Sequence, residues 1–328
     1  MRRRRSTGPS FGGRRARRWP VALLQVLVAA VAVYALAWVV LNAGDDPATP
    51  IAASGAVAGD RASGSSSFEP SSPAPIELLA VDAFDVDWRK PPRAALVFDV
   101  ENGDSLYRRR ATAELPIASL TKIMTALAVT GATQPDDVVR IPKGLRYEGS
   151  AVGLLPLGRR VRLEPLLAGL LIVSGNDAAV ALADHVSGGE RRFVALMNEQ
   201  ARLWNLDCTH FSTPHGLSDR DRSCAVDLAV MTRLAMRERR ITRLTRRAQA
   251  SYRFPIKGHK LFLSGHNPLI RADYPGAMGL KTGYTDAAGR CFVGVARRDG
   301  RSFGVVLLDS PDPGKQAARL LDLAFENG

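Results

Sequence analysis

Lysine is rare in this 328-residue chain, so each lysine is a candidate for a role that arginine cannot fill. The sequence contains seven lysines and 38 arginines. A guanidinium stays protonated at any accessible pH, whereas a buried lysine can lose its proton and then act as a base. Three short motifs contain the residue types of nucleophilic catalysis, and two of them include a lysine.

The first motif is Ser119-Leu-Thr-Lys122, the only Ser/Thr-x-x-Lys in the chain. It stands at the start of a helical pattern over 120–129, where a spacing of three places both side chains on one helical face. The helix N-terminus adds partial positive charge where an attacking oxygen would become negative. Ser119 is therefore a candidate nucleophile and Lys122 its candidate base. The ordinary alternative is a serine helix cap followed by a surface lysine.

The second motif, Ser174-Gly-Asn176, is the only Ser-x-Asn in the chain and separates two apolar helical stretches, 163–173 and 178–186. A hydroxyl at this turn could relay a proton, and an amide could bind a peptide group of a substrate. The ordinary alternative is a capped connection between two helices.

The third motif, Lys281-Thr282-Gly283, precedes the last strand-like hairpin of the sequence. A lysine and a hydroxyl on a strand can hold a carboxylate, and a glycine allows another backbone to approach closely. An extended peptide could add to such an edge as a further strand. The ordinary alternative is an exposed strand lysine followed by a turn.

The elements that must position these motifs are strands at the two ends of the folding region and helices between them. Alternating apolar residues and a turn at Asn102-Gly103 predict a hairpin over 94–109, and a second hairpin is predicted over 290–308. A C-terminal helix is predicted over 315–325, with Ala318, Leu321 and Phe325 on one face. Helical patterns dominate 120–247. This order predicts an α+β fold, in which both ends of the domain form one antiparallel sheet flanked by helices and an all-α subdomain is inserted between them.

The formal charge of +13 is concentrated at the N-terminus, where residues 1–18 contain eight arginines and no acidic residue. The next 23 residues, Trp19 to Leu41, carry no charge. As a helix they would cover roughly 34 Å, which is enough to cross a bilayer. We therefore predict a cytoplasmic tail, 1–18, followed by an uncleaved transmembrane anchor, 19–41, with the N-terminus inside by the positive-inside rule. A cleaved signal peptide and a buried helix are the alternatives.

The segment 42–76 is rich in Ser, Pro, Gly and Ala and predicts a flexible linker. Residues 77–328 then form the one folded domain, which we expect outside the cell membrane in a single-pass protein. Because the basic excess is largely an orientation signal for the anchor, it gives no reason to expect a nucleic-acid partner.

The three motifs together, in this order, resemble the signature of the penicillin-binding and serine β-lactamase superfamily. Longer stretches resemble its low-molecular-mass D-alanyl-D-alanine carboxypeptidases, peptidase family S11. These stretches are ASLTKIMTALA (118–128), SGNDAAVALADHVSG (174–188), FVALMNEQA (193–201), THFSTPHGL (209–217) and YPGAMGLKTGYTDAAGRCFVGVARRDGR (274–301). The resemblance covers roughly residues 78–325.

The resemblance implies a serine carboxypeptidase that removes the terminal D-alanine of peptidoglycan pentapeptides ending in D-Ala-D-Ala and is acylated by β-lactams. The implied roles are a nucleophile at Ser119, a base at Lys122 and a proton relay at Ser174. Asn176, Lys281, Thr282, Gly283 and Tyr284 are implied to bind the substrate, with the backbone N–H groups of Ser119 and Tyr284 as the oxyanion hole. No metal ion or other cofactor is expected.

Two alternatives remain beside the carboxypeptidase. A class A serine β-lactamase would need a Glu-x-x-Leu-Asn stretch after the Ser-x-Asn motif, and the sequence has none. A non-catalytic β-lactam sensor or cell-wall-binding protein would be acylated without turnover. Relatives often place an arginine near the substrate carboxylate after the last strand, but this sequence offers only Lys315 and Arg319 there as candidates.

The three cysteines are expected in two different states. Cys208 and Cys224 flank the THFSTPHGL stretch and are candidates for a disulfide, which an extracytoplasmic domain would preserve. Cys291 lies in an apolar strand pattern and is expected to be a buried free thiol. The five histidines have no metal-ligand spacing, and His215 is expected to be structural.

Overall fold

The structure is a computed structural model that describes residues 75–79, 81–153 and 155–328, all of them within the unit Ser66–Gly328. The predicted tail 1–18, the predicted anchor 19–41 and most of the predicted linker lie outside the described residues. None of the helices in the described part is long and apolar enough to cross a membrane.

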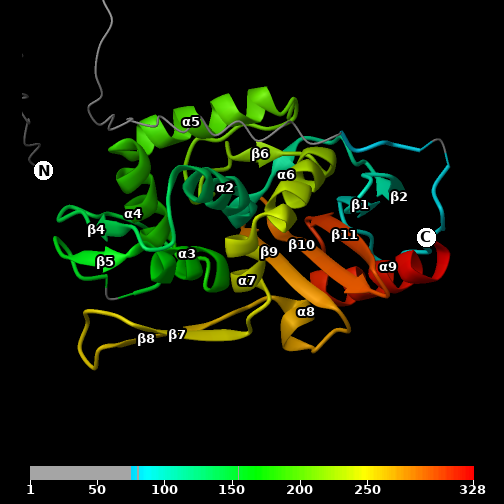
Figure 1. The fold of residues 1–328 in the computed structure, drawn as a ribbon. Coiled ribbons are helices and arrows are strands. Elements are labelled where there is room, and N and C mark those ends of the chain that lie inside the picture. Colours follow the sequence, from blue (N-terminus) through cyan, green and yellow to red (C-terminus); the bar gives the residue numbers. More distant parts are fainter. Residues whose placement is uncertain (1–74, 80, 154) are drawn as a thin grey trace, which may run out of the picture. The chain divides into compact units, whose positions relative to one another are not determined.

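Five antiparallel strands form the central sheet in the order β2-β1-β11-β10-β9. Their bounds are β1 Ala94–Asp99, β2 Ser105–Arg109, β9 Ala277–Thr285, β10 Gly289–Arg298 and β11 Arg301–Leu308. The first and last strands of the domain are thus neighbours, as predicted, because β1 pairs with β11. Figure 1 shows this sheet beside a group of helices that comes from the middle of the chain.

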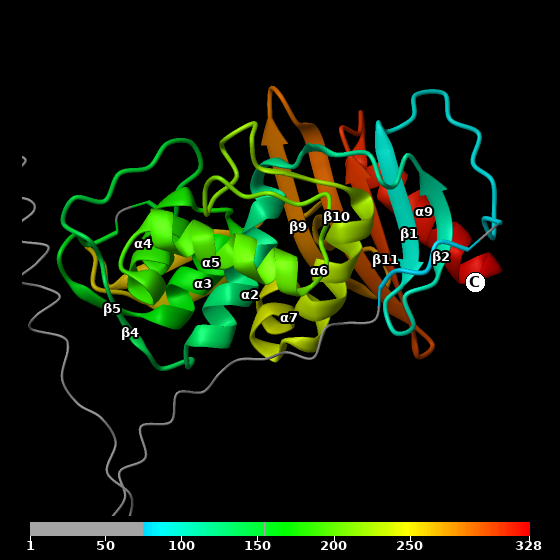
Figure 2. The same cartoon turned by 90° about the horizontal axis from the view of Figure 1, so that it is seen from above.

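The alternation of side chains along the strands gives the sheet two apolar faces. On one face Val97, Val305 and Leu307 pack with the C-terminal helix α9, Pro313–Asn327. On the other face Leu96 and its neighbours join the large core that includes the middle helices. Figure 2 shows α9 on one side of the sheet and α6 on the other.

The helices between the two halves of the sheet carry the first two motifs. Their bounds are η1 Ala118–Thr121, α2 Lys122–Ala132, α3 Leu163–Ile172, α4 Asn176–Ser187, α5 Glu190–Leu203, α6 Ala225–Arg237, α7 Arg239–Thr245 and α8 Pro268–Arg271. α2 is central, since it contacts α3, α4, α5 and α6. Buried residues lie on nearly every side of α2, so packing fixes this helix and the first motif at its start.

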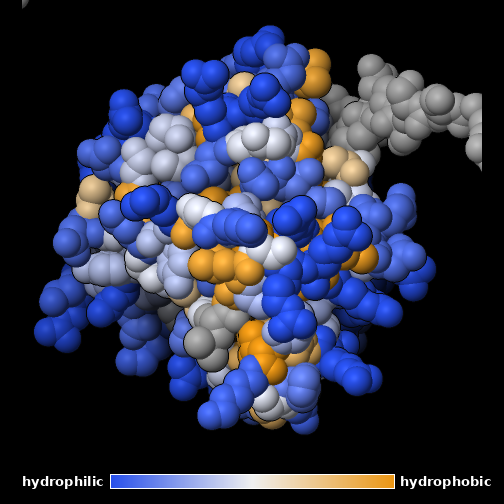
Figure 3. Space-filling model, turned by 90° about the vertical axis from the view of Figure 1, so that its left-hand side faces the viewer, coloured by the Kyte–Doolittle hydropathy of each residue, from blue (hydrophilic) through white to orange (hydrophobic). Residues whose placement is uncertain are grey.

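The prediction of an all-α insert is wrong in detail, because short two-stranded sheets lie among the helices. The pairs are β4 Val138–Arg140 with β5 Arg160–Arg162, β7 Gln249–Arg253 with β8 Lys260–Ser264, and β3 Leu115–Pro116 with β6 Arg222–Ser223. β3, β4, β5 and β6 have only two or three residues, too few for a sustained alternating pattern, whereas β7 and β8 have five residues each and lie beyond the helical patterns of 120–247. The face of the molecule toward β4, β5, β7 and β8 is largely hydrophilic, with small and separate apolar areas (Figure 3).

Two boundaries also differ from the prediction. Ile76, assigned to the linker, is only 7% exposed and belongs to the core. Leu321 of the predicted face of α9 is fully buried, as expected, and the buried face also includes Ala317, Leu320 and Ala324. Ala318 and Phe325 of the predicted face are only partly buried and pack against the edge of this core.

Candidate active site

Ser119 lies in a short, tight turn that comes just before α2. The turn, η1, is a 3-10 helix, and α2 begins only at Lys122. Ala118 adopts φ +48°, a conformation unfavourable for a residue with a side chain. Gly216 packs against the backbone here, because a Cβ atom at that position would lie 2.0 Å from the carbonyl oxygen of Ala118. Only glycine leaves room for this contact, so a distant loop presses directly on the turn that carries Ser119.

The amine of Lys122 is held among three oxygen atoms. Its Nζ lies 2.9 Å from Ser119 Oγ, 2.6 Å from Asn176 Oδ1 and 2.6 Å from the carbonyl oxygen of His215. The side chain is fully buried. The spacing of Ser119 and Lys122 thus places the two groups within hydrogen-bonding distance, and the alternative of a surface lysine is wrong.

The three contacts suit a neutral amine. The carbonyl of His215 accepts only, and Asn176 presents its oxygen because its amide nitrogen donates to Glu148 O at 2.5 Å. These two acceptors take the two N–H bonds of a neutral lysine. In the structure Nζ also donates to Ser119 Oγ. Once Lys122 is neutral and its two N–H bonds point to the other two acceptors, its lone pair is free to accept the proton of the Ser119 hydroxyl.

Burial is the main reason why the pKa of Lys122 lies well below its ordinary value of 10.5. The nearby charge of Lys281 lowers this pKa further, while Asp221 and Asp177 raise it. The direction favours a lysine that can accept a proton. A guanidinium at this position would remain charged and could not do so.

The second motif meets the first at the start of α4. Ser174 has φ +61°, and Asn176 is the first residue of α4. The adjacent Asp177 is buried and accepts from the backbone N–H groups of Val152 and Gly153 at 2.8 and 3.0 Å. This carboxylate therefore fixes the segment before α3 against the start of α4, beside Asn176.

Lys281 of strand β9 connects the third motif to the second. Its Nζ donates to Ser174 Oγ at 2.9 Å and to the carbonyl oxygen of Thr282 at 2.8 Å. Burial lowers the pKa of Lys281 to about 7. The two buried lysines thus lie on either side of the Ser174 and Asn176 turn, and each contacts one of its polar side chains.

Gly283 allows β9 to approach the turn at Ser119. A Cβ atom at Gly283 would lie 3.0 Å from Ile117 O and 3.1 Å from the backbone nitrogen of Ser119. The next residue, Tyr284, is 63% exposed and its hydroxyl donates to Asp286. The close approach brings the backbone after Gly283 beside the Ser119 N–H, where the oxyanion hole is expected.

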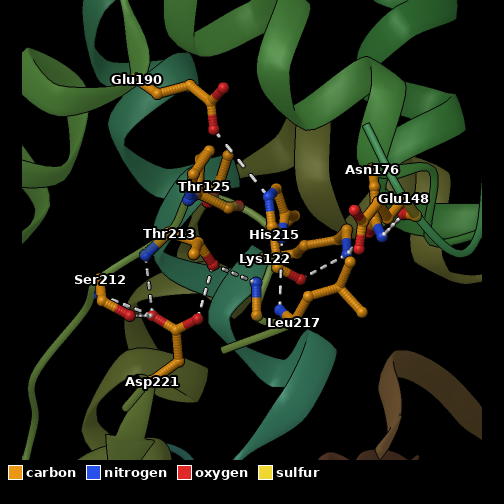
Figure 4. Close-up of polar contacts among 12 residues, drawn as sticks. Lys122, Thr125, Glu148, Asn176, Glu190, Ser212, Thr213, His215, Leu217 and Asp221 are labelled. Carbon is orange, nitrogen blue, oxygen red and sulfur yellow. Dashed lines mark hydrogen bonds and ion pairs between the residues drawn. The ribbon is translucent and has the colours of Figure 1, made fainter. Parts of the chain in front are cut away.

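Sequence reasoning missed Asp221, which holds the loop 212–216 in place. Its fully buried carboxylate accepts from the backbone nitrogens of Ser212 and Thr213 at 2.6 and 2.9 Å and from Thr213 Oγ1 at 2.5 Å. The loop then offers the Pro214 carbonyl to Thr125 Oγ1 of α2 at 2.6 Å, and the next carbonyl to Lys122. Figure 4 shows these contacts together. A buried aspartate in a polar loop has no distinctive sequence pattern, so only the fold reveals its role.

His215 contributes its carbonyl oxygen to the site. Burial and the nearby Lys122 charge lower the pKa of its imidazole to about 4, although Asp221 acts in the opposite direction. The ring is therefore neutral at pH 7. Its Nδ1 accepts from the backbone nitrogen of Leu217 at 3.3 Å, which further fixes the loop.

The cysteines occupy the expected kinds of environment. Cys208 and Cys224 are joined by a disulfide, and Cys291 is buried, with its pKa raised to about 12 by burial. The disulfide closes a loop that contains Asp221 and His215. Asp227 lies close to the two sulfur atoms, but sulfurs in a disulfide are not thiolate ligands for a metal ion.

The structure does not bring Lys315 or Arg319 to Lys281. Lys315 pairs with Asp312, and Arg319 donates to Asp87 O beside a separate cavity on α9. A basic residue that the sequence analysis missed lies nearer: Arg290 is directly opposite Tyr284 in the pairing of β9 with β10. Its guanidinium donates to Pro311 O at 2.9 Å and is exposed.

Comparison with known proteins agrees with this fold and site. Residues 89–312 match the family model of D-alanyl-D-alanine carboxypeptidase, peptidase family S11. D-alanyl-D-alanine carboxypeptidase DacF of Bacillus subtilis is 32% identical over 242 residues, 71% of this chain and 62% of its own length. DacB2 of Mycobacterium tuberculosis is 37% identical over 245 residues, 72% of this chain and 82% of its own length.

A solved structure shows the same similarity at the level of the fold. The crystal structure of D-alanyl-D-alanine carboxypeptidase from Mycobacterium tuberculosis H37Rv matches with a TM-score of 0.68 and 34% identity, over 73% of this chain and 92% of that one. The fold and site thus define a serine peptidase of the penicillin-binding class. This chain belongs to the D-alanyl-D-alanine carboxypeptidase family, S11.

Proposed function

We propose that the chain is a serine-type D-alanyl-D-alanine carboxypeptidase that removes the terminal D-alanine from peptidoglycan stem peptides and is acylated by penicillin. The observation that carries the proposal is the position of the buried Lys122 amine, 2.9 Å from Ser119 Oγ, with two pure acceptors for its N–H bonds. This arrangement supplies a lysine as the base that activates the hydroxyl.

In the first step Ser119 Oγ attacks the carbonyl carbon of the peptide bond between the two D-alanines. Its proton moves to the lone pair of Lys122, and the carbonyl oxygen becomes negative beside the N–H groups of Ser119 and Tyr284. The C–N bond then breaks, and Lys122 gives up the proton it accepted, which passes through Ser174 Oγ to the leaving amine of D-alanine and leaves Lys122 neutral. The product is an ester on Ser119.

In the second step water hydrolyses this ester. Lys122, neutral again, accepts a proton from the water as the water attacks, and the proton returns to Ser119 Oγ as the ester bond breaks. The same base therefore serves both halves of the reaction. β-Lactams would enter by the first step, with the ring amide in place of the peptide bond.

The terminal carboxylate of the substrate would be bound by Lys281 and Thr282. A carboxylate beside the buried Lys281 stabilises the protonated amine, so that substrate binding raises a pKa that is about 7 in the free protein. Asn176 would bind the peptide backbone of the substrate, and Gly283 keeps this edge of β9 open to it. Recognition of a free terminal carboxylate is what makes the enzyme a carboxypeptidase.

We also propose that the protein is a single-pass membrane protein with its N-terminus in the cytoplasm and the catalytic domain outside. The arginine-rich 1–18, the uncharged 19–41 and the polar 42–76 support this arrangement. The disulfide between Cys208 and Cys224 suits an oxidising compartment.

The experiment that tests the function measures D-alanine release from a peptide ending in D-Ala-D-Ala, together with covalent labelling by a fluorescent penicillin. The native protein should release D-alanine, and Ser119→Ala should lose both release and labelling. A Ser105→Ala variant is a suitable control, because Ser105 is a buried strand serine outside the site. Rapid penicillin hydrolysis without D-alanine release would identify a β-lactamase, and stable labelling without any turnover would identify a sensor.

A further inference from the structure

A cluster of arginines surrounds a surface cavity beside α7, away from the catalytic residues. The cavity has a volume of about 650 Å³, and five of its seven lining residues are arginines: Arg239, Arg240, Arg243, Arg246 and Arg247. We call these five residues the arginine cluster. Arg240 is half-buried, and the other four are exposed.

The charge of the arginine cluster is only partly balanced. Glu164, 15% exposed, pairs with both Arg240 and Arg243. Among the residues that the structure describes, no acidic side chain lines the cavity itself. Arg239 and Arg243 lie four residues apart on α7, a spacing at which like charges repel one another, so an anion that enters the cavity would relieve this repulsion. Guanidinium groups bind phosphate, like carboxylate, with two parallel hydrogen bonds, so phosphate groups fit an arginine-lined cavity.

The arginine cluster lies toward the end of the sheet opposite the active site. α7 contacts the beginning of β9, where Thr245 Oγ1 donates to Met278 O at 2.9 Å. Tyr284 is six residues further along the same strand, roughly 20 Å away at a rise of about 3.3 Å per residue. A surface bound to α7 therefore leaves the catalytic turn open to a peptide.

The described chain begins at this same end of the sheet. Glu77 pairs with Asp104 in the turn between β1 and β2. The register places Asp99, at the end of β1, opposite Phe303 of β11. Phe303 in turn lies opposite Ala296 of β10, which pairs with Ala277 at the start of β9. The first described residues, at Glu77, thus lie at the end of the sheet where α7 packs.

We propose that the arginine cluster binds the phosphate headgroups of an anionic phospholipid surface and holds the domain with its active site directed away from the membrane. The proposal rests on the membrane attachment proposed above, and the first described residues lie at the end of the sheet where α7 packs. Basic residues close to an anionic membrane each raise partitioning about fivefold, so several together give a specific orientation.

Residues 66–328 provide a clean test, since they lack the arginine-rich tail and the predicted anchor. This unit can be tested alone, because the matching crystal structure aligns with it over 92% of its own length. Sedimentation with vesicles of phosphatidylcholine alone, and of phosphatidylcholine with phosphatidylglycerol, measures binding. We expect binding to the anionic vesicles only, and a decrease as salt is added.

The decisive variant replaces Arg239, Arg246 and Arg247 with glutamine and leaves the ion pairs to Glu164 intact. Loss of three basic residues should weaken binding to anionic vesicles by roughly 100-fold. A matched control replaces the exposed Arg191, Arg192 and Arg253 with glutamine, which gives the same net charge. Both variants should release D-alanine from a soluble peptide as the native unit does.

Equal vesicle binding by the two triple variants would overturn the proposal, because net charge alone would then explain the interaction. Binding of soluble inorganic polyphosphate without binding to anionic vesicles would also overturn it, since the ligand would then be a soluble polyanion. Vesicle binding does not depend on carboxypeptidase activity, so failure of this proposal and failure of the proposed function are distinguishable.

Discussion

The Nζ atom of Lys122 lies 2.6 Å from the carbonyl oxygen of His215, a residue 93 positions further along the chain. This contact joins α2 to the loop 212–216, and through that loop to Asp221. The candidate base is therefore oriented by a backbone group as well as by Asn176. The orientation matters because a neutral lysine has only one lone pair, and two fixed acceptors leave it directed at Ser119.

A first prediction concerns the chemical nature of the base. Lys122→Arg keeps the positive charge but removes a group that can lose its proton. We expect kcat/KM for D-alanine release to fall by about 10² to 10⁴, the usual contribution of a general base. The rate of penicillin labelling should fall in parallel. Full activity in this variant would show that no deprotonated amine is required, and circular dichroism checks that the variant is folded.

A second prediction concerns Asp221 as a positioning residue. Asp221→Asn replaces a carboxylate that accepts several hydrogen bonds with an amide whose NH₂ group faces backbone N–H donors. We expect kcat to fall about tenfold or more because the loop no longer fixes Lys122, with a smaller change in KM. Because Asp221 raises the pKa of Lys122 in the native protein, its loss should also lower that pKa.

The matched control for this substitution is Asp219→Asn, at an exposed position two residues away. It should leave kcat and the pH profile unchanged. If Asp221→Asn lowered the thermal stability but kept the native kcat and pH profile at a temperature where it is folded, the carboxylate would be merely structural. Asp221→Glu, which retains the negative charge, should recover part of the lost activity.

The elements that carry the motifs were largely predictable from sequence, since they depend on local patterns. Alternating apolar residues predicted the first and last hairpins, and the antiparallel pairing of β1 with β11 confirms the sheet formed from both ends. The single Ser-x-x-Lys, Ser-x-Asn and Lys-Thr-Gly motifs predicted which side chains meet. The three motifs lie far apart in the sequence but meet in the fold, because the proposed chemistry needs all three together.

Other parts of the site could not be predicted, because they are made by backbone atoms or by residues without a local pattern. Any residue type at the position of His215 would supply a backbone carbonyl, so the sequence does not mark this position as part of the site. Asp221 lies among polar loop residues, and its burial follows from tertiary packing alone. Arg290 was missed because the pairing of β10 with β9, rather than sequence distance, places it opposite Tyr284.

A third prediction concerns pH. The pKa of Lys122 is lowered, so kcat/KM should rise as this lysine loses its proton with increasing pH. The pKa of Lys281 is lowered to about 7, so the charge that binds a carboxylate should be lost from the free protein as pH rises above that value. A bell-shaped profile of kcat/KM follows. His215, with a pKa of about 4, is neutral near pH 7, where the alkaline limb begins.

The variant Lys281→Arg separates the two limbs. A guanidinium does not titrate in this range, so the alkaline decrease should disappear while the acidic limb remains. Protonation of Lys281 should also make the free energy of unfolding depend on pH. Because its pKa in the folded state is below that in the unfolded state, the unfolded chain binds more protons between about pH 7 and 10, and the free energy of unfolding rises with pH there. An alkaline limb unchanged in Lys281→Arg would assign it to another group.

A fourth prediction concerns recognition of the substrate carboxylate by Arg290. This arginine lies opposite Tyr284, and its guanidinium contacts Pro311 O in the segment that follows the last strand. We expect Arg290→Gln to raise KM for a peptide ending in a free carboxylate about fivefold, since an exposed ion pair contributes at most about 1 kcal/mol. For the same peptide with a C-terminal amide, KM should not change. Lys315→Gln removes a comparable exposed charge on α9 and should leave both KM values as they are. Equal effects of Arg290→Gln on the acid and the amide would mean that this arginine acts on the strand end and not on the carboxylate, because only the acid has a charge for it to bind.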